Sequence, residues 1–233
     1  MFARRAKSSI VNRKSSFPLN HHSAPILLLD GATGTELGRR GVDISLPMWS
    51  AHAILEAPDI LAEVHRKYLQ AGADLITANT FRTHRRSLAK ADMADRCVEL
   101  TQRAVAIARA ARDEITPGAK VLGSVAPLED CYTPELAPDF HTCEREHAEM
   151  ISHLLDAGVD MILIETMNCL REASAAARQA ARLAPGKWMM SLCTCSDGPP
   201  GVLLSGEPAM DLVPLVKDAF SFGVNCVAAP AIE

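Results

Sequence analysis

Polar and thiol side chains recur at six points along the chain, each directly after a short apolar run. These points hold carboxylates, hydroxyls, an amide and thiols, which is more polar than structural loops require. They are Asp30-Gly31, Asn79-Thr80, Ser124 to Asp130, Glu165-Thr166, Cys193 to Ser196 and Asn225-Cys226. A thiol becomes a good nucleophile and metal ligand only as its thiolate. The chemistry is therefore expected where these points converge.

Alternating strand-like and helix-like segments must position these side chains. Strands are predicted over residues 26–29, 74–78, 121–125, 161–164, 188–194 and 224–229. Helices are predicted over residues 58–71, 93–115, 143–157, 170–183 and 210–222. Such alternation indicates a parallel sheet covered by helices.

The phrases Ala-Gly-Ala-Asp at 71–74 and Ala-Gly-Val-Asp at 157–160 both join a helix to a strand. This repeat, and the lack of a GxGxxG motif after the first strand, favour a (β/α)8 barrel of the TIM type over a dinucleotide-binding sheet. About six of its eight β/α units are present. In such barrels the chemistry lies at the ends of the strands, where the polar residues were found.

Composition limits the class of protein. Of 233 residues, 48% are hydrophobic and 22% charged, as in ordinary globular chains. Residues 1–25 carry five basic and no acidic residues, whereas the rest carries 19 basic against 28 acidic ones. An acidic body with 4% aromatic residues excludes a nucleic-acid binder, and no apolar stretch is long enough for a membrane span.

The basic segment 1–25 is predicted to be a disordered tail, followed by one barrel domain over residues 26–233. Its composition also fits an organelle transit peptide. The seven cysteines have irregular spacing and form no CxxC pair, so reduced thiols are expected. These features predict a cytoplasmic protein, with a mitochondrial or plastid location as the alternative.

Several motifs, in this order over about residues 26–233, resemble the zinc-dependent homocysteine S-methyltransferases. They are Asp30-Gly31-Ala32-Thr33-Gly34-Thr35-Glu36-Leu37, Arg40-Gly41, Pro47-Met48-Trp49-Ser50, the stretch 65–74, Thr77-Ala78-Asn79-Thr80-Phe81, Gly123-Ser124-Val125, Glu165-Thr166 and Gly223-Val224-Asn225-Cys226. Each is weak alone, but together they are specific.

The resemblance implies transfer of a methyl group from a donor to the zinc-activated thiol of homocysteine, giving methionine. The Leu-Pro-Met-Trp-Ser stretch at 46–50 favours S-methylmethionine as the donor. Cys226 would be the catalytic residue as a zinc ligand. In the family the other two ligands are a downstream Cys-Cys pair, which this sequence does not contain.

The zinc site and the barrel are therefore expected to be incomplete in this chain, with open sheet edges that favour self-association. The alternative is a truncated, non-catalytic homologue that binds an amino acid or a protein partner. A replacement zinc site built on Cys226 is not demanded by the spacing of the other cysteines that follow strands, which are Cys131, Cys169, Cys193 and Cys195. An aldolase-type barrel would need a lysine at a strand end, and none of the six ends has one.

The resemblance also implies a substrate site. Asp30 and Gly31 would contact the amino group and backbone of homocysteine, Glu165 would pair with its ammonium group, and Asn225 belongs to the same site. Thr80 either binds homocysteine or caps the next helix. Trp49 either packs in the core or faces a sulfonium donor by a cation–π contact.

Two other residue pairs have structural interpretations. Thr33-x-x-Glu36 reads as a capping box, and His65 and Tyr68 on one helix face read as packing residues.

Overall fold

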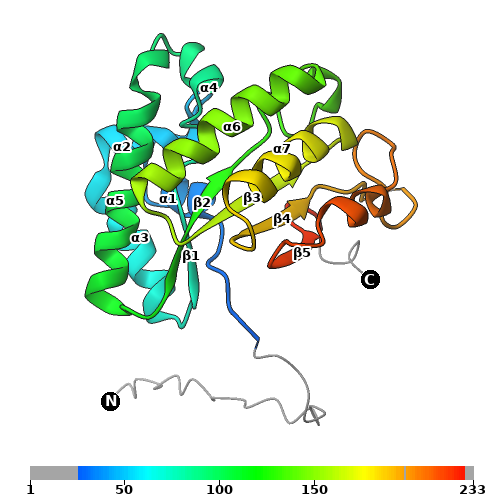
Figure 1. Ribbon diagram of the computed structural model, residues 1–233. Helices are drawn as coiled ribbons and strands as arrows, with labels where there is room; N and C mark the ends of the chain where they lie inside the picture. Colours follow the sequence, from blue (N-terminus) through cyan, green and yellow to red (C-terminus); the bar gives the residue numbers. More distant parts are fainter. Residues whose placement is uncertain (1–25, 197, 229–233) are drawn as a thin grey trace, which may run out of the picture.

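The computed structural model describes residues 26–196 and 198–228 (Figure 1). The predicted tail, residues 1–25, lies outside the described residues. One parallel sheet has five strands in chain order, β1-β2-β3-β4-β5. The strands are β1 (Leu75–Ala78), β2 (Lys120–Val125), β3 (Met161–Met167), β4 (Trp188–Leu192) and β5 (Ser221–Val224).

Helices precede and separate the strands. They are α1 (Thr33–Arg39), α2 (His52–Glu56), α3 (Pro58–Gln70), α4 (Arg85–Ala89), α5 (Cys97–Ile115), α6 (Phe140–Ala157) and α7 (Leu170–Leu183). Short 3₁₀ helices cover Trp49–Ala51, Ala94–Arg96, Pro134–Leu136 and Ala209–Leu215. Parallel strands joined in order by outer helices form the wall of a TIM-type barrel, as predicted.

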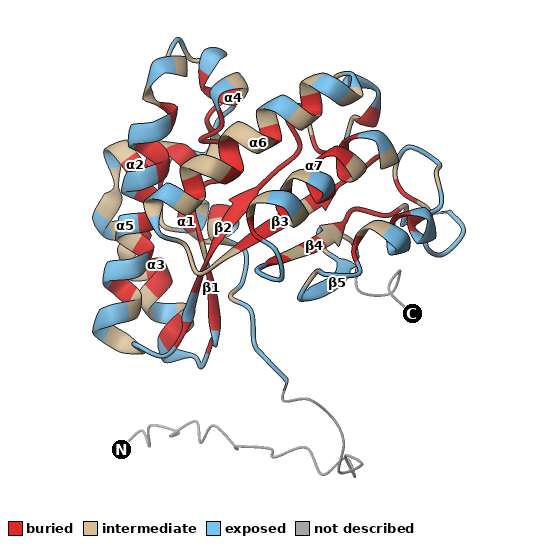
Figure 2. Ribbon diagram, in the orientation of Figure 1, coloured by how far each residue is buried: buried red, intermediate tan, exposed pale blue. Residues whose placement is uncertain are grey.

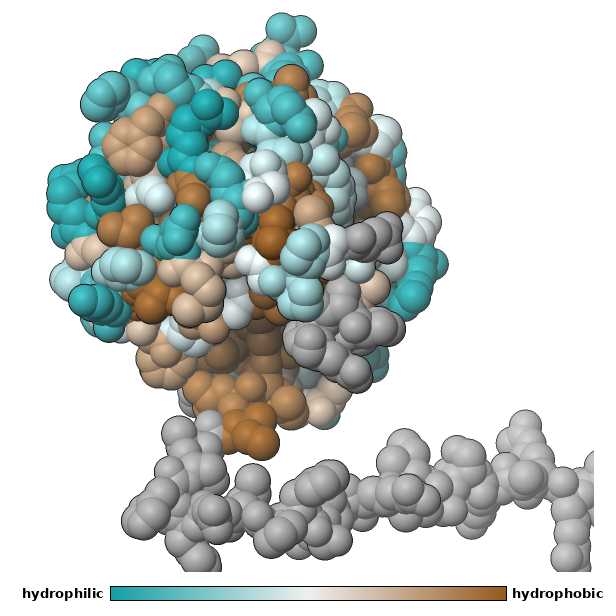
Figure 3. Space-filling model, turned by 90° about the vertical axis from the view of Figure 1, so that its right-hand side faces the viewer, coloured by the Kyte–Doolittle hydropathy of each residue, from teal (hydrophilic) through white to brown (hydrophobic). Residues whose placement is uncertain are grey.

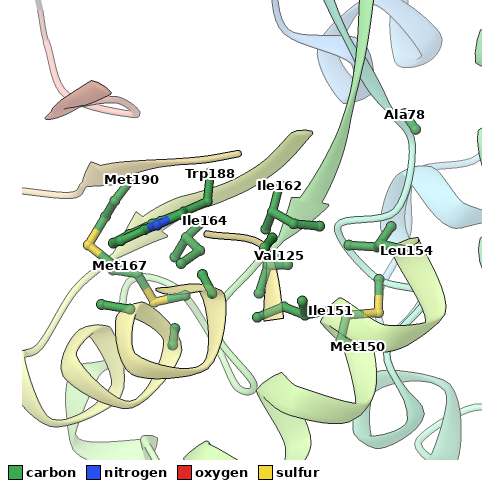
Figure 4. Packing of buried hydrophobic residues seen from close by; sticks show 14 of the residues in the cluster. Ala78, Val125, Met150, Ile151, Leu154, Ile162, Ile164, Met167, Trp188 and Met190 are labelled. Atoms are coloured by element: carbon green, nitrogen blue, oxygen red, sulfur yellow. The ribbon is translucent and has the colours of Figure 1, made fainter. Parts of the chain in front are cut away.

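The main apolar core lies between the sheet and the helices that cover it. Helices α5, α6 and α7 contact β1 to β4, and their buried faces point toward the sheet (Figure 2). Trp188, Ile162 and Ile164 from the strands pack with Ile151 and Leu154 from α6 (Figure 4). Gly123 permits this contact, because a Cβ there would lie 2.8 Å from a methyl group of Leu154. A second cluster packs α1, α2, α3 and α5 together.

The first predicted strand is only partly formed. Leu29 makes a single parallel bridge to Leu75, and Asp30 N donates to Leu75 O at 2.9 Å. This places residues 26–29 as a sixth extended segment beside β1. Their side chains are 43–76% exposed, so the prediction of a buried strand was wrong. Among the described residues the segment pairs with β1 alone, and no second strand covers it.

The predicted helix over 210–222 was also wrong. Its first part is the 3₁₀ helix Ala209–Leu215, which contains Pro214. Proline has no N–H for the helix ladder and clashes with the preceding turn. The chain then pairs with β4 as β5, about three residues earlier than the predicted strand 224–229.

Exposed apolar side chains remain at both edges of the sheet. Those of Ile26 to Leu29 lie at the edge beside β1, and those of Phe220, Phe222 and Val224 lie at the edge formed by β5. Apolar residues gather toward the lower part of the face shown in Figure 3. In residues 26–196 and 198–228, no helix is both long and apolar enough to cross a membrane.

Candidate functional site

One cavity of about 570 Å³ opens at the C-terminal ends of the strands. Its wall includes six of the seven residues predicted to contact substrate or metal, which are Asp30, Gly31, Trp49, Glu165, Asn225 and Cys226, together with motif residues such as Asn79. Residues almost 200 positions apart thus meet in one place, because parallel strands all end at the same side of the barrel.

Two carboxyl groups face this cavity without a basic partner. Asp30 accepts hydrogen bonds from Thr77 N at 2.8 Å and from Thr77 Oγ1 at 3.0 Å. Burial raises the pKa of Asp30 to about 7, against the lowering effect of the Thr77 hydrogen bonds, and the charge of Glu165 raises it further. Burial also raises the pKa of Glu165, although a hydrogen bond from Ser124 opposes this.

Hydrogen bonds fix Glu165 from both sides. Ser124 Oγ donates to Oε1 at 2.5 Å, and Asn225 Nδ2 lies 3.3 Å from Oε2. The strand is irregular here: the register of β3 on β4 shifts between Ile164 and Met167, and Thr166 has a φ of 61°. Such irregularities re-aim side chains at barrel rims.

The Asn225 side chain organises the thiol end of the cavity. Its Oδ1 accepts from Thr166 N at 2.9 Å, and its Nδ2 lies 2.9 Å from Thr166 Oγ1 and 3.4 Å from Cys226 Sγ. Cys226 is exposed, has a φ of 54°, and its sulfur lies 3.5 Å from Thr166 Oγ1. The thiol is therefore presented to the cavity rather than packed in the core.

Further thiols surround Cys226. Burial, reinforced by the neighbouring Cys226, raises the pKa of Cys131 and of Cys193 to about 11. The Cys193 Sγ lies 3.7 Å from the carbonyl oxygen of Cys226. Within the described residues, however, no three donor groups that include Cys226 have ligand atoms within 4.8 Å of one another. Among the thiols that the structure describes, those near Cys226 therefore form no three-donor group with it.

Trp49 lies at the cavity wall with specific support. Its ring meets Phe81 edge-on, with centroids 5.4 Å apart. A Cβ at Gly34 would lie 2.3 Å from the Trp49 ring, so only glycine fits there. Ser50 and Asn79 exchange two hydrogen bonds, of 2.6 and 2.7 Å, that fix the Trp49 segment to the end of β1. The indole is thus both packed and half-exposed to the cavity.

Thr80 is fully buried and does not line the cavity. Its hydroxyl donates to Ser124 O at 3.0 Å and accepts from Ser124 N at 2.9 Å, which joins the ends of β1 and β2. The capping interpretation is wrong, because His84 caps α4. The capping box was also wrong: Ala32 is the N-cap of α1 without a side-chain bond, and Glu36 pairs with Arg40.

His65 and Tyr68 have different surroundings. His65 is fully buried with no hydrogen-bond partner on either ring nitrogen, as a packing residue would be. The Tyr68 ring lies so close to Gly31 that a Cβ at Gly31 would be 2.8 Å from its hydroxyl. Gly31 therefore gives Tyr68 room at the cavity edge.

The sequence placed Thr77, Ser124 and Thr166 in motifs at the strand ends but did not reveal that they orient the site. Thr77 holds Asp30, Ser124 holds Glu165, and Thr166 holds Asn225. Tyr132 and Arg82 also line the cavity. The only indication of their role in the sequence was their position, since these residues lie within or next to the strand ends.

The chain was compared with known proteins. A family model described as homocysteine S-methyltransferase matches residues 27–233. The chain is 30% identical to homocysteine S-methyltransferase YbgG of Bacillus subtilis, over 90% of this chain and 72% of that protein. It is 33% identical to methionine synthase of Mycobacterium tuberculosis, but spans only 18% of that longer protein. The crystal structure of the metallated homocysteine methyltransferase MmuM from Escherichia coli superimposes with a TM-score of 0.80 at 28% identity, covering 89% of this chain and 76% of that one.

Proposed function

Because the chain belongs to the homocysteine S-methyltransferase family, we propose that it transfers a methyl group from a sulfonium donor to the sulfur of homocysteine. The observation that carries this proposal is the cavity that brings Asp30, Glu165, Asn225 and Cys226 together. Two carboxyl groups and a free thiol line the same cavity, and Asn225 contacts both Glu165 and Cys226, which suits a small amino acid that carries a sulfur. The enzyme is favoured over a non-catalytic homologue because the relatives that match most of the chain are methyltransferases.

The two carboxyl groups would bind the ammonium group of homocysteine. Both have raised pKa values, since they are buried together without a counter-charge. An entering ammonium supplies that charge, and Ser124 and Thr77 already hold the carboxylate oxygens in place. Gly31 would contact the substrate backbone at the cavity edge, while Thr80 acts behind the wall by orienting Ser124.

The sulfur of homocysteine would lie near Cys226, which also lines the cavity. We propose Cys226 as a zinc ligand, because its thiol is exposed to the cavity and thiolates suit zinc. One thiol does not make a zinc site, and the described residues form no group of three donors that includes Cys226. When bound, zinc acidifies a thiol ligand.

The transfer itself is a displacement at carbon. A lone pair on the homocysteine sulfur forms a bond to the donor methyl carbon, and the donor C–S bond breaks with its electron pair left on the donor sulfur. The thiol proton of homocysteine is released, and a sulfonium donor becomes a neutral thioether. With S-methylmethionine both products are methionine. The Trp49 and Phe81 rings would attract the sulfonium charge until it is lost.

Methionine formation by the purified chain tests this proposal. The assay supplies homocysteine and zinc with S-methylmethionine, and betaine or methyltetrahydrofolate replaces the donor in parallel reactions. Product is expected with S-methylmethionine and is expected to fall in Cys226→Ser. A chain that binds homocysteine but forms no methionine with any donor would refute methyl transfer.

The free thiols bear on the compartment in which the protein works. All seven cysteines are free, and two of them, Cys131 and Cys226, line the cavity. We propose that the protein works in a reducing compartment such as the cytoplasm, where these thiols stay reduced.

A further inference from the structure

A second group of metal-binding side chains lies outside the cavity, at the contact between α5 and α6. Cys97 is the first residue of α5, and Glu149 and His153 lie on α6. One ligand atom from each, a sulfur, a carboxylate oxygen and a ring nitrogen, lies within 4.8 Å of the other two. None of the three lines the cavity described above.

The helix geometry explains the convergence. Glu149 and His153 are four residues apart, so both side chains project from one face of α6. Helix α5 packs against α6 on the outer side of the sheet, which brings its first residue to that face (Figure 1). Cys97 is 1% exposed, whereas Glu149 and His153 are half-buried. The sulfur side of the group is therefore buried, whereas its carboxylate and imidazole side is accessible to solvent.

Arg85 orients the carboxylate of Glu149 through only one of its two oxygens. Its Nε and Nη2 both donate to Glu149 Oε1, at 2.9 and 2.7 Å. Among the described residues, the other oxygen, Oε2, accepts no hydrogen bond. A carboxylate held in orientation by an arginine, with one oxygen free, is a suitable metal ligand.

We propose that Cys97, Glu149 and His153 bind a divalent transition-metal ion such as zinc, at a site separate from the catalytic cavity. Sulfur, imidazole and carboxylate ligands in one site suit zinc and cobalt. Zinc–ligand bonds of about 2.0–2.3 Å require donor atoms roughly 3.5 Å apart, so a rotamer adjustment of about 1 Å completes the group. The thiolate and carboxylate balance the charge of the ion, and water fills the fourth position on the exposed side.

The bound ion would fasten the start of α5 to α6. Arg85 is the first residue of α4, so its bonds to Glu149 extend this link to α4, and it also donates to the carbonyl oxygen of Ala94 at 3.3 Å, in the short 3₁₀ helix Ala94–Arg96. The site would therefore stabilise the outer helix layer and would take no part in methyl transfer. It does not rest on the proposed function, because its residues and its readout are different.

Cobalt binding to the full chain tests the site. The measurement uses Cys226→Ser, so that the cavity thiol does not contribute, and titrates Co²⁺ into the metal-free protein. One equivalent is expected to bind with a thiolate-to-cobalt charge-transfer band. Zinc should displace it and raise the melting temperature.

Matched variants in the same background identify the ligands. Cys97→Ala and His153→Asn should each abolish the charge-transfer band. His141→Asn, on an exposed histidine of the same helix, should leave it unchanged. If Cys97→Ala does not fold, the test relies on His153→Asn, which should bind cobalt at least tenfold more weakly. Absence of the band in Cys226→Ser, or an unchanged band in His153→Asn, would overturn the proposal.

Discussion

Replacing Glu165 by glutamine should selectively remove recognition of the homocysteine ammonium group. The substitution keeps the shape of the side chain but removes its charge. Ser124 Oγ donates to Glu165 Oε1 at 2.5 Å and can donate in the same way to the amide oxygen, so the side chain should keep its place, and only the longer 3.3 Å contact from Asn225 is lost. The loss should then reflect the missing ion pair rather than a moved side chain.

The magnitude follows from the burial of the pair. Truncating one partner of a buried, hydrogen-bonded charge pair costs about 2–5 kcal/mol, and about 1.4 kcal/mol is tenfold in affinity. Asp30 remains as a second carboxyl group near the ammonium, so the lower end applies. Glu165→Gln should weaken homocysteine binding by roughly 30- to 100-fold.

Isothermal titration calorimetry with two ligands isolates this effect. Homocysteine is compared with 4-mercaptobutanoate, which has the thiol and the carboxylate but no amino group. Glu165→Gln should weaken the first and leave the second nearly unchanged. Glu56→Gln, an exposed glutamate on α2, is the matched control. Equal losses for both ligands, or a loss below about threefold for homocysteine, would refute the assignment of Glu165 as the ammonium partner.

Three other predictions follow from the structure. The pKa of Asp30 is raised to about 7 from an ordinary value of 3.8, so its contribution to the stability of the ligand-free protein is present at acid pH and is lost as the pH rises through 7. Asp30→Asn should flatten this part of the profile of melting temperature against pH, and an unchanged profile would contradict the assignment. Gly34→Ala puts a Cβ 2.3 Å from the Trp49 ring and should cost about 1–3 kcal/mol in urea unfolding, whereas Gly118→Ala, with no neighbour within 4 Å, should cost less. The exposed strand β5 should cause concentration-dependent association, which light scattering can measure. A monomer at every concentration would contradict this prediction.

The order of the elements and the location of the site could be predicted from the sequence because both depend on local patterns. Apolar runs followed by Asp30, Glu165 and Asn225 indicate strand ends, and parallel strands place such ends together. The helix predicted over 170–183 agrees with α7, since its alanine-rich sequence has no internal break. These predictions needed no knowledge of which strands are neighbours.

The errors occurred where tertiary contacts decide the local structure. Pro214 and pairing with β4 turn the predicted helix over 210–222 into a 3₁₀ helix and a strand. Glu36 has the position of a capping residue but pairs with Arg40. Ser124 could not be identified as the partner of Glu165 without the register of β2 on β3, which pairs Ser124 with Leu163 and so brings it beside the strand's end.

The hydrogen bonds that join the strand ends are also the bonds that orient the proposed site. Asp30 is tied to Thr77 of β1, and Thr80, just after β1, is tied to Ser124 of β2. Ser124 in turn holds Glu165 of β3.

Asn225, just after β5, extends this series. It contacts Glu165, and it reaches past β4 to Thr166. Each of these polar residues thus has a partner on another segment of the sheet, so the groups proposed to bind the ammonium are preorganised before the substrate arrives. The same connection means that a change at Ser124 or Asn225 would act on Glu165 as well, so losses of affinity at these residues should not be additive.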